Sequence, residues 1–302
     1  MKCIVTGGAG FIGSNLTDRL IDDGHEVIIF DDLSTGFKEN VNSKARFNNI
    51  DVGIEQSVPY MVNLMEGVDV VFHMACLARV QPSIEEPLLY HNKNINGLVN
   101  VLEACRKSGV KRLVFSSSSS VYGDAEEVPT TEMCQLDPMS PYALHKLVGE
   151  QYCKLYSDLY GIETVSLRYF NVYGERQPTI GAYCLVMGVF AQQLLNGEPM
   201  TINGDGEQRR DFTYVGDVVD ANIKCATMKM DWKGDIINIG AGDNRSVNQI
   251  ADLLGGDRIH RDPVIEPKET LAYNGKAKFM LDWKSTTALE EWIPKWKKDI
   301  GL

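Results

Sequence analysis

The sequence predicts an α/β protein built on a doubly wound parallel sheet, with a smaller C-terminal α/β lobe. In the first 120 residues, short β-branched stretches alternate with longer stretches of helical period, which is the order of a βαβ series. After about residue 172 this alternation becomes irregular, and charged, glycine-containing loops such as NGDGEQRRD (203–211) appear. Because crossovers between parallel strands are right-handed, we expect helices on both faces of the sheet.

The chain has 302 residues, enough for one large domain with a second lobe. We expect residues 1–171 to form the first domain, with a return segment near 211–241, and residues 172–302 to form most of the second lobe. The composition, 44% hydrophobic and 24% charged, is that of a globular protein. No run of 18 apolar residues occurs, so the sequence predicts no membrane-spanning helix.

The charge balance is acidic. Lys and Arg number 30 and Asp and Glu number 41, which gives a formal net charge of −11. This disfavours nucleic acid and anionic membrane surfaces as partners. A small anionic ligand remains compatible, because a few local cations and backbone N–H groups can outweigh the global sign.

The cysteines are odd in number and scattered, with no CxxC pair and no Cys/His cluster. This pattern indicates free thiols in a reducing compartment and argues against a disulfide framework or structural zinc. The N-terminal apolar run is too short for a secretory signal, so we expect a cytoplasmic protein without a bound metal. The seven are Cys3, Cys76, Cys105, Cys134, Cys153, Cys184 and Cys225.

The first element is a strand over Cys3–Thr6, followed at once by GGAGFIG (7–13) and a helix over Ser14–Asp23. Glycine permits the tight bend, and a missing Cβ lets the backbone approach a diphosphate. The diphosphate then meets free N–H groups at a helix N-terminus. Strand, glycine loop and helix together predict a Rossmann dinucleotide site that uses Gly7, Gly10, Phe11, Ile12 and Gly13.

The second strand, Glu26–Phe30, ends in Asp31 and Asp32. Asp31 lies 18 residues beyond Gly13, close to where an acidic residue should accept hydrogen bonds from a ribose. A carboxylate at this place repels a 2′-phosphate, so the expected cofactor is NAD rather than NADP.

Asp51 and Val52 follow a third short apolar stretch and are expected to border the adenine, although an ordinary strand-end Asp explains Asp51 equally well. A further strand is predicted over Val68–His73, and a long helix over Leu89–Ser108.

The next strand, Arg112–Ser116, runs into five serines and then Val-Tyr-Gly. Because the run follows a strand directly, it lies at the carboxyl edge of the sheet, where ligands bind in open α/β folds. Small hydroxyl side chains there can donate to a substrate oxygen without filling the cleft.

A helix is predicted over Pro141–Tyr160, with Ser140 as N-cap. Tyr142 and Lys146 are then one turn apart on the same face. Tyrosine is a poor base at its ordinary pKa, but the ammonium and a positive nicotinamide ring favour the phenolate and bring the pKa towards neutrality. The pair is thus a candidate acid/base that takes the proton of a sugar hydroxyl while hydride leaves the carbon bearing that hydroxyl.

These motifs together resemble the extended short-chain dehydrogenase/reductase superfamily, in its NAD-dependent epimerase/dehydratase family. Within it the chain is similar to nucleotide-sugar 4-epimerases of the UDP-glucose (UDP-galactose) type. The resemblance covers nearly the whole chain and rests on TGGAGFIGSNL, FDDLSTG, HMACLARVQPSIEEP, NKNINGLVNVLEA, FSSSSSVYGD, SPYALHK, LRYFNVYGERQ, GDGEQRRDFTYVGDVV and INIGAG.

The resemblance implies roles by position. Ser118 is the catalytic hydroxyl, Tyr142 the base, and Lys146 its modulator and a ribose contact. Ala75 and Asn94 line the cofactor. On the substrate side, the resemblance implies that Asn171 contacts the diphosphate or sugar, that Arg210 holds the diphosphate, and that Thr270 gates the C2 side of the sugar.

Some positions depart from the family pattern. His145 replaces a small residue before the lysine, and we expect it to face solvent without a role. Near the C-terminus an expected arginine is missing, with Arg261 the nearest candidate, and Tyr273 stands where an aspartate is usual. Threonine at position 270 is small and hints at room for an N-acetylated sugar.

The resemblance implies transient oxidation at C4 of a UDP-hexose, through a 4-keto intermediate, by firmly held NAD⁺. A 4-epimerase of UDP-N-acetylglucosamine or UDP-glucuronate is an open alternative. A dehydratase is disfavoured, because Ser119 and Ser120 stand where dehydration needs an Asp-Glu pair, and a sugar-acid decarboxylase is a further, less favoured alternative. A non-enzymatic NAD-binding sensor or scaffold is a further alternative, and a homodimer formed by the two long helices is the expected assembly.

Overall fold

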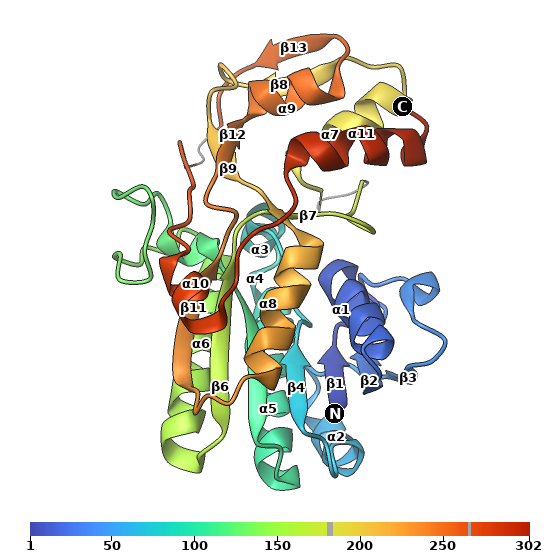
Figure 1. Ribbon diagram of the computed structural model, residues 1–302, viewed down its shortest axis with the longest axis vertical. Coiled ribbons are helices and arrows are strands. Elements are labelled where there is room, and N and C mark those ends of the chain that lie inside the picture. The colour runs from blue at the N-terminus through green and yellow to red at the C-terminus, as the bar shows by residue number, and fades with distance from the viewer. Residues whose placement is uncertain (180–183, 265–266) are drawn as a thin grey trace. The chain divides into compact units, whose positions relative to one another are not determined.

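The computed structural model describes residues 1–179, 184–264 and 267–302 (Figure 1). Its central feature is a seven-stranded sheet in the order β11-β6-β5-β4-β1-β2-β3. The strands are β1 (Lys2–Thr6), β2 (Glu26–Asp31), β3 (Arg46–Asn49), β4 (Val70–His73), β5 (Arg112–Ser118), β6 (Glu163–Tyr169) and β11 (Lys233–Ile239).

The pairs β1–β2, β1–β4, β2–β3 and β4–β5 are parallel. The strand order reverses between β1 and β4, and ligands bind outside the carboxyl ends of strands at such a switch point. The predicted fold class, a doubly wound parallel sheet, is therefore confirmed.

Helices cover both faces of this sheet. Figure 1 shows α1 and α8 in front of the strands and α5 and α6 behind them. The helices and short helical turns of this part are α1 (Phe11–Asp22), η1 (Lys38–Asn40), η2 (Glu55–Ser57), α2 (Val58–Leu64), α3 (Val80–Glu85), α4 (Pro87–His91), η3 (Asn92–Asn96), α5 (Gly97–Ser108), α6 (Pro141–Tyr160) and α8 (Val215–Thr227).

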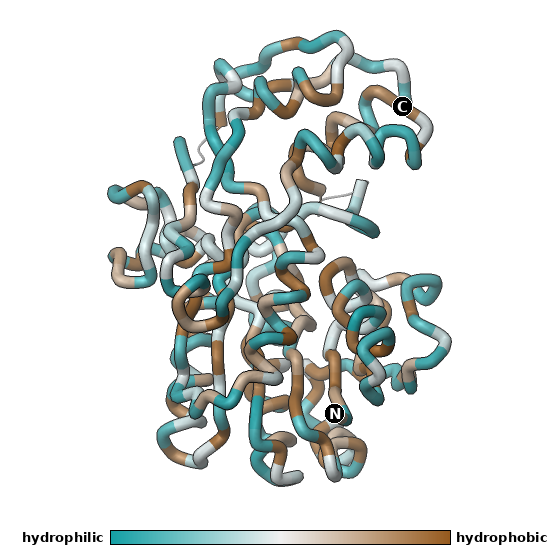
Figure 2. The backbone as a smooth tube through the Cα atoms, in the orientation of Figure 1, coloured by the Kyte–Doolittle hydropathy of each residue, from teal (hydrophilic) through white to brown (hydrophobic). Residues whose placement is uncertain are grey.

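The apolar core explains this layering. Ile4 and Val71 of the strands pack with Leu98 and Val101 of α5 in one buried cluster, which α2 and α6 extend. Neighbouring strand residues point to the other face and are buried as well, because β-strand side chains alternate. Figure 2 shows the apolar residues concentrated along these strands.

The predicted helix over residues 89–108 is not uniform. It consists of α4, then the π-helical turn η3, then α5. A π-turn inserts an extra residue into the helical repeat and shifts the directions of the side chains around it, and such turns often occur at functional sites.

The chain forms two compact units. Unit 1 comprises Met1–Val121, Pro138–Arg168 and Val219–Ile237, and unit 2 comprises Tyr122–Asp137, Tyr169–Val218 and Asn238–Leu302. Residues of η4 (Ser119–Tyr122) and of α8 fall in both units. The elements that lie wholly in unit 2 are β7 (Val172–Tyr173), α7 (Val186–Leu195), β8 (Met200–Asn203), β9 (Arg209–Asp211), β10 (Thr213–Tyr214), β12 (Asn244–Ser246), α9 (Val247–Leu254), β13 (Arg258–Arg261), α10 (Gly275–Leu281) and α11 (Leu289–Ile300).

Unit 2 has its own apolar core. Leu289, Trp292, Ile293 and Trp296 of α11 recur at helical spacing, and all four are buried against α7 and α9. Helix α9 begins with a capping box in which the Ser246 side chain and the N3 glutamine bond each other's backbone N–H groups. Across the described residues of both units, no helix combines the length and apolarity needed to cross a membrane.

Candidate active site

The glycine-rich turn between β1 and α1 is so tight that a Cβ does not fit. Gly7 has φ +68°, and a Cβ on Gly13 would lie 2.2 Å from the Gly7 carbonyl oxygen. Gly10 precedes α1 and donates its N–H to the same carbonyl at 3.1 Å. The N–H groups of Phe11 and Ile12 open the helix, where a backbone donor has no intrahelical carbonyl to meet. The turn can therefore cradle an anionic diphosphate.

Asp31 ends β2 beside this turn. Its two carboxylate oxygens accept the N–H groups of Ala9 at 2.9 Å and Leu33 at 2.8 Å. Burial raises the pKa of Asp31 above its ordinary value, and these two hydrogen bonds partly oppose the rise. Each oxygen keeps a second lone pair, so Asp31 can also accept hydrogen bonds from ribose hydroxyls.

Asp32 and Asp51 lie on either side of Lys93, a residue that the sequence analysis did not single out. The Lys93 ammonium is 2.6 Å from a carboxylate oxygen of each. The carbonyl of Val52 accepts the Asn100 side-chain N–H at 2.8 Å, which docks the Asp51 loop on α5. The predicted adenosine end of the site is thus a charged cluster.

Ala75 and Asn94 fix the loop after β4. The N–H of Ala75 donates to the Thr6 hydroxyl at 3.1 Å, and the same hydroxyl meets Nδ1 of His73 at 2.9 Å. Asn94 accepts the Leu77 N–H at 2.8 Å and donates to the Leu77 carbonyl at 2.9 Å. The loop is therefore pinned next to the glycine turn.

Helix α6 presents one polar side chain per turn towards the serine run of β5. Tyr142, Lys146 and Glu150 follow one another at intervals of four residues. The Lys146 ammonium donates to the carbonyl of Ser116 at 2.6 Å, and the Ser117 hydroxyl donates to Glu150 at 2.5 Å. The serines are thus an ordered strand end, fixed by the helix that carries the tyrosine.

The hydroxyls of Ser118 and Tyr142 are hydrogen-bonded to each other. Ser118 also accepts the N–H of Ser120 at 3.2 Å. At the start of α6, Ser140 accepts a first-turn N–H at 3.1 Å, as expected for an N-cap, and the Tyr142 N–H donates to the Ser83 hydroxyl at 3.1 Å. Both the backbone and the side chain of Tyr142 are therefore positioned.

Burial and the neighbouring groups act in opposite directions on the pKa of Tyr142. Burial raises it above its ordinary value, and Lys146 and the bond from Ser118 lower it by less. The lysine alone therefore does not bring the phenol towards neutrality. The positive charge of a bound nicotinamide ring is the remaining influence that can do so.

Lys146 is buried and charged. Burial alone would lower its pKa, but Cys76 and Tyr142 raise it above the ordinary value. Four residues further along α6, Glu150 forms a two-point ion pair with Arg168, with distances of 2.8 and 2.7 Å. Both side chains are at most 2% exposed. The face of α6 that carries Tyr142 and Lys146 thus continues into a buried charge pair.

The expectation that His145 faces solvent is wrong. The residue is 7% exposed, and its ring meets that of His91 edge-on at 5.5 Å. Burial, followed by His91 and Lys146, lowers the pKa of His145 to about 4, so the ring is neutral at pH 7. The physical reason is that α6 packs against α4 along this side.

Asn171, Arg210 and Thr270, the predicted substrate residues, all lie in unit 2. The Asn171 amide donates to the Asp211 carbonyl at 2.9 Å and lies 3.5 Å from the Thr270 hydroxyl. The Arg210 guanidinium donates to the Arg209 carbonyl at 2.9 Å. β9 and its neighbouring loops therefore bring the three predicted residues into one region.

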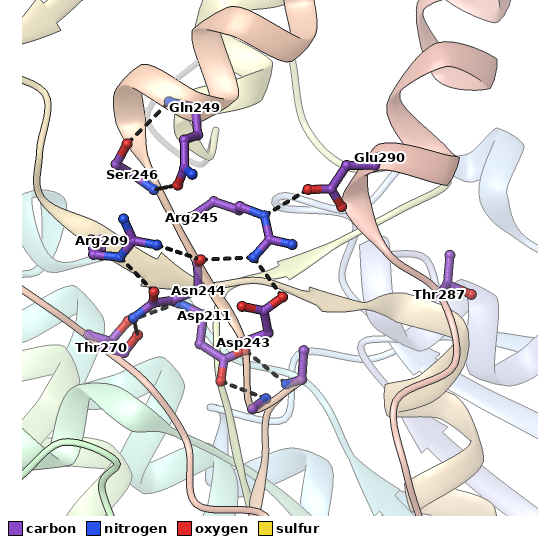
Figure 3. Close-up of polar contacts among 12 residues, drawn as sticks. Arg209, Asp211, Asp243, Asn244, Arg245, Ser246, Gln249, Thr270, Thr287 and Glu290 are labelled. Carbon is purple, nitrogen blue, oxygen red and sulfur yellow. Dashed lines mark hydrogen bonds and ion pairs between the residues drawn. The ribbon is translucent and has the colours of Figure 1, made fainter.

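Two further arginines lie on the paired strands β9 and β12 of unit 2 (Figure 3). Arg209 donates to the side chain of Asn244 at 2.7 Å and to its carbonyl at 3.0 Å. Arg245 pairs with Asp243 at 2.6 Å and with Glu290 at 2.7 Å. Sequence reasoning did not select these residues, because nothing along the chain indicates that β9 pairs with β12.

Arg261, the nearest replacement for the missing family arginine, ends β13 and lies opposite Asn203 of β8. Its side chain is exposed. Tyr273 is also exposed, and its N–H donates to the Thr130 carbonyl at 2.9 Å.

Asp211 ties three loops of unit 2 together. It is fully buried, and its carboxylate accepts the N–H groups of Ala241 at 2.8 Å, Gly242 at 3.0 Å and Ala272 at 2.9 Å. Figure 3 shows Asp211 below Arg209 and Arg245. Burial raises the pKa of Asp211 to about 6, and the three N–H groups oppose the rise.

This shift predicts a pH dependence of stability. The folded state holds the Asp211 proton more tightly than the unfolded state, whose pKa is near 3.8. Its contribution is therefore complete below that value and is lost as the pH rises through about 6. Denaturant unfolding between these values should show a decline in the unfolding free energy of the wild-type protein that Asp211→Asn lacks; equal slopes would contradict this assignment.

Comparison with known proteins gives consistent matches. Residues 3–240 match the family described as the NAD dependent epimerase/dehydratase family. A protein of Methanocaldococcus jannaschii that carries the provisional name UDP-glucose 4-epimerase is 42% identical, over 99% of this chain and 94% of its own.

Solved structures agree. The UDP-glucose 4-epimerase of Thermotoga maritima, solved with UDP-glucose, is 36% identical with a TM-score of 0.93, covering 99% of this chain and 100% of that one. The UDP-N-acetylglucosamine 4-epimerase of Methanobrevibacter ruminantium, in complex with UDP-N-acetylmuramic acid, is 34% identical with a TM-score of 0.91, covering 99% and 98%.

Proposed function

The chain belongs to the NAD-dependent epimerase/dehydratase family and is an NAD-dependent epimerase, and on that premise we propose that it interconverts UDP-glucose and UDP-galactose. The observation that carries the proposal is the seating of α6 on the serine run. Tyr142 and Lys146 are ordered against Ser116–Ser118 at the carboxyl edge of the sheet, and a single strand, β4, separates β5 from β1, which the glycine turn follows. The relatives that share this fold over almost the whole chain act on UDP-sugars.

Tyr142 is the proposed acid/base. Its phenol takes the proton of the sugar C4 hydroxyl and later returns it, while the Ser118 hydroxyl bonds the same sugar oxygen and keeps it oriented. Lys146 holds a positive charge beside the phenol and so stabilises the phenolate. The buried setting strengthens these interactions, because water does not screen them.

The residues of unit 1 fit the dinucleotide. The glycine turn offers backbone N–H groups to the diphosphate, Asp31 and Asp32 offer acceptors to the adenosine ribose, and Asp51 borders the adenine. Ala75 and Asn94 are proposed to line the nicotinamide side, with Lys146 at its ribose. NAD⁺, when bound, supplies a hydride acceptor that returns the hydride to the opposite face of a 4-keto sugar.

We assign the UDP-sugar to residues of unit 2. Arg210 is the proposed contact of the diphosphate, because a guanidinium fork matches two phosphate oxygens. Asn171 donates to the diphosphate or sugar. Thr270 limits the space at C2, and its small side chain keeps an N-acetylated sugar as the second candidate, in line with the N-acetylglucosamine relative.

An assay of UDP-glucose, UDP-N-acetylglucosamine and UDP-glucuronate tests the choice of sugar. We expect UDP-glucose to give its 4-epimer fastest. If the protein converts only UDP-N-acetylglucosamine or only UDP-glucuronate, that nucleotide sugar is the substrate in place of UDP-glucose. Failure to convert any, in a protein that binds NAD⁺, would favour a sensor or scaffold, and loss of C6 oxygen or of CO₂ would show a dehydratase or decarboxylase.

We also propose a homodimer through α4 and α6. Both helices carry exposed large apolar side chains: Leu88 is 81% and Leu159 61% exposed, and Leu89, Leu144 and Leu155 are exposed as well. We propose that they form one contiguous apolar patch, and such a patch marks an interface more often than bare surface. Sedimentation at micromolar concentration should show a dimer that Leu159→Glu weakens; a wild-type monomer would reject the proposal.

Cytoplasmic localisation is part of the proposal. All seven cysteines lie in the described residues, and none of them forms a disulfide. Free thiols of this kind fit a reducing compartment.

A further inference from the structure

Lys93 joins two carboxylates that come from different strands. We call Asp32, Lys93 and Asp51 the Lys93 bridge. The ammonium lies 2.6 Å from Oδ2 of Asp32 and 2.6 Å from Oδ2 of Asp51, and the three side chains are 22–24% exposed. Because both oxygens approach the same nitrogen, the two negative charges are held close together.

The remaining carboxylate oxygens are fixed as well. Oδ1 of Asp32 accepts the N–H of Ser34 at 2.9 Å and its hydroxyl at 2.5 Å. Oδ1 of Asp51 accepts the N–H of Gly53 at 2.9 Å. The bridge therefore defines the position of both acids and of the turns that follow β2 and β3.

The π-turn η3 places the lysine there. η3 packs directly on the loop after β3, where a Cβ on Gly53 would lie 3.0 Å from the Asn92 carbonyl oxygen. A Cβ on Gly97, the next residue after η3, would lie 3.2 Å from the Val52 side chain. At this close approach Lys93 reaches the acids while its neighbour Asn94 bonds Leu77.

The charges of the bridge depend on one another. Burial alone would raise the pKa of Asp32, but Lys93 and Ser34 lower it below its ordinary value. Burial would lower the pKa of Lys93, but the hydrogen bonds that it donates to Asp32 and Asp51 raise it. Asp32 and Lys93 are therefore both charged at pH 7, and removal of the ammonium leaves the Asp32 and Asp51 side chains facing each other with no cation between them.

We propose that Lys93 is a positioning residue for NAD⁺, which holds Asp32 and Asp51 together at the adenosine end of the cofactor site. The inference rests on the proposed placement of the adenosine against these two acids. Without the ammonium the carboxylates move apart, and the turns after β2 and β3 move with them. The adenosine then loses its contacts with these two acids. The nucleotide-sugar residues of unit 2 are not part of the bridge, so UDP binding is unaffected.

Four variants test this. Lys93→Met removes the charge, Lys93→Arg keeps it, and Lys93→Met/Asp51→Asn removes one charge of each sign. Lys154→Met is the matched control, because Lys154 pairs with Asp158 on the exposed side of α6. The readouts are the dissociation constants of NAD⁺ and of UDP by calorimetry, NAD⁺ retained after gel filtration, and the melting temperature.

We expect Lys93→Met to bind NAD⁺ about tenfold more weakly with UDP binding unchanged, and Lys93→Arg and the double variant to recover most of the loss. NAD⁺ binding by Lys93→Met equal to that of Lys154→Met would overturn the inference. So would equal losses of NAD⁺ and UDP binding with a lower melting temperature, which would mean a purely structural lysine. Wild-type protein that binds no NAD⁺ would instead overturn the proposed function, on which the inference depends.

Discussion

Tyr142→Phe should lower turnover by about two to four orders of magnitude, the usual contribution of a positioned acid/base group. The phenol hydroxyl meets Ser118, and its ring lies 5.7 Å from the Lys146 ammonium. Phenylalanine keeps the ring and its packing but cannot take or return a proton. Binding of NAD⁺ and UDP should change little, so the loss should appear in kcat rather than in KM.

The matched control is Tyr160→Phe at the far end of α6. Tyr160 is 49% exposed, and its ring packs on Tyr156. This variant should keep wild-type turnover. Turnover within tenfold of wild type for Tyr142→Phe would remove Tyr142 from the mechanism.

Glu150→Gln should have the largest effect on stability. It leaves the Arg168 guanidinium as an uncompensated charge at 1% exposure, and breaking a buried pair in this way costs about 3–5 kcal/mol of unfolding free energy. The same change removes a negative charge that helps to keep Lys146 protonated. The alkaline limb of the pH–rate profile should therefore move to lower pH.

Two comparisons separate these effects. Glu150→Gln/Arg168→Met removes both charges and should recover most of the stability, while the pH–rate profile stays shifted. Asp158→Asn, which breaks an exposed pair on the same helix, should change the unfolding free energy by less than about 1 kcal/mol. Equal losses for Glu150→Gln and Asp158→Asn would contradict the assigned role of the buried pair.

Much of the fold follows from local pattern. The predicted helix Pro141–Tyr160 has these bounds in the structure, because Ser140 caps it and Gly161 ends it in the left-handed conformation. The strands before the glycine turn and the serine run are also placed within a few residues. The spacing of apolar residues and the presence of capping residues are local features of the sequence, so the bounds of these elements can be predicted from it.

The features that the sequence missed depend on distant contacts. Helical period runs unbroken through residues 89–108 and cannot show that a π-turn redirects Lys93 towards Asp32 and Asp51. His145 was expected at the surface because the sequence around it does not show that α4, from another part of the chain, packs on it and buries it. The spacing of Tyr142 and Lys146 likewise reveals the ammonium beside the phenol but not the burial that raises the pKa of Tyr142.

The candidate site was easier to predict for unit 1 than for unit 2. The glycine turn, the acids after β2 and the tyrosine–lysine pair each combine a motif with a position on the sheet. Arg209, Asp211 and Asn244 come together only through the pairing of β9 with β12 and through loop contacts at Ala272. No motif in the sequence indicates that these three residues lie close together.

The fate of a deuterium label at C4 of the sugar gives the most direct test of epimerisation by transient oxidation at that carbon. UDP-glucose carrying deuterium at C4 should be converted to UDP-galactose that keeps the deuterium at C4, because the hydride leaves the carbon and returns to it without meeting solvent. Product with hydrogen from water at C4, or conversion that proceeds unchanged in protein stripped of NAD⁺, would contradict epimerisation through a transient 4-keto sugar.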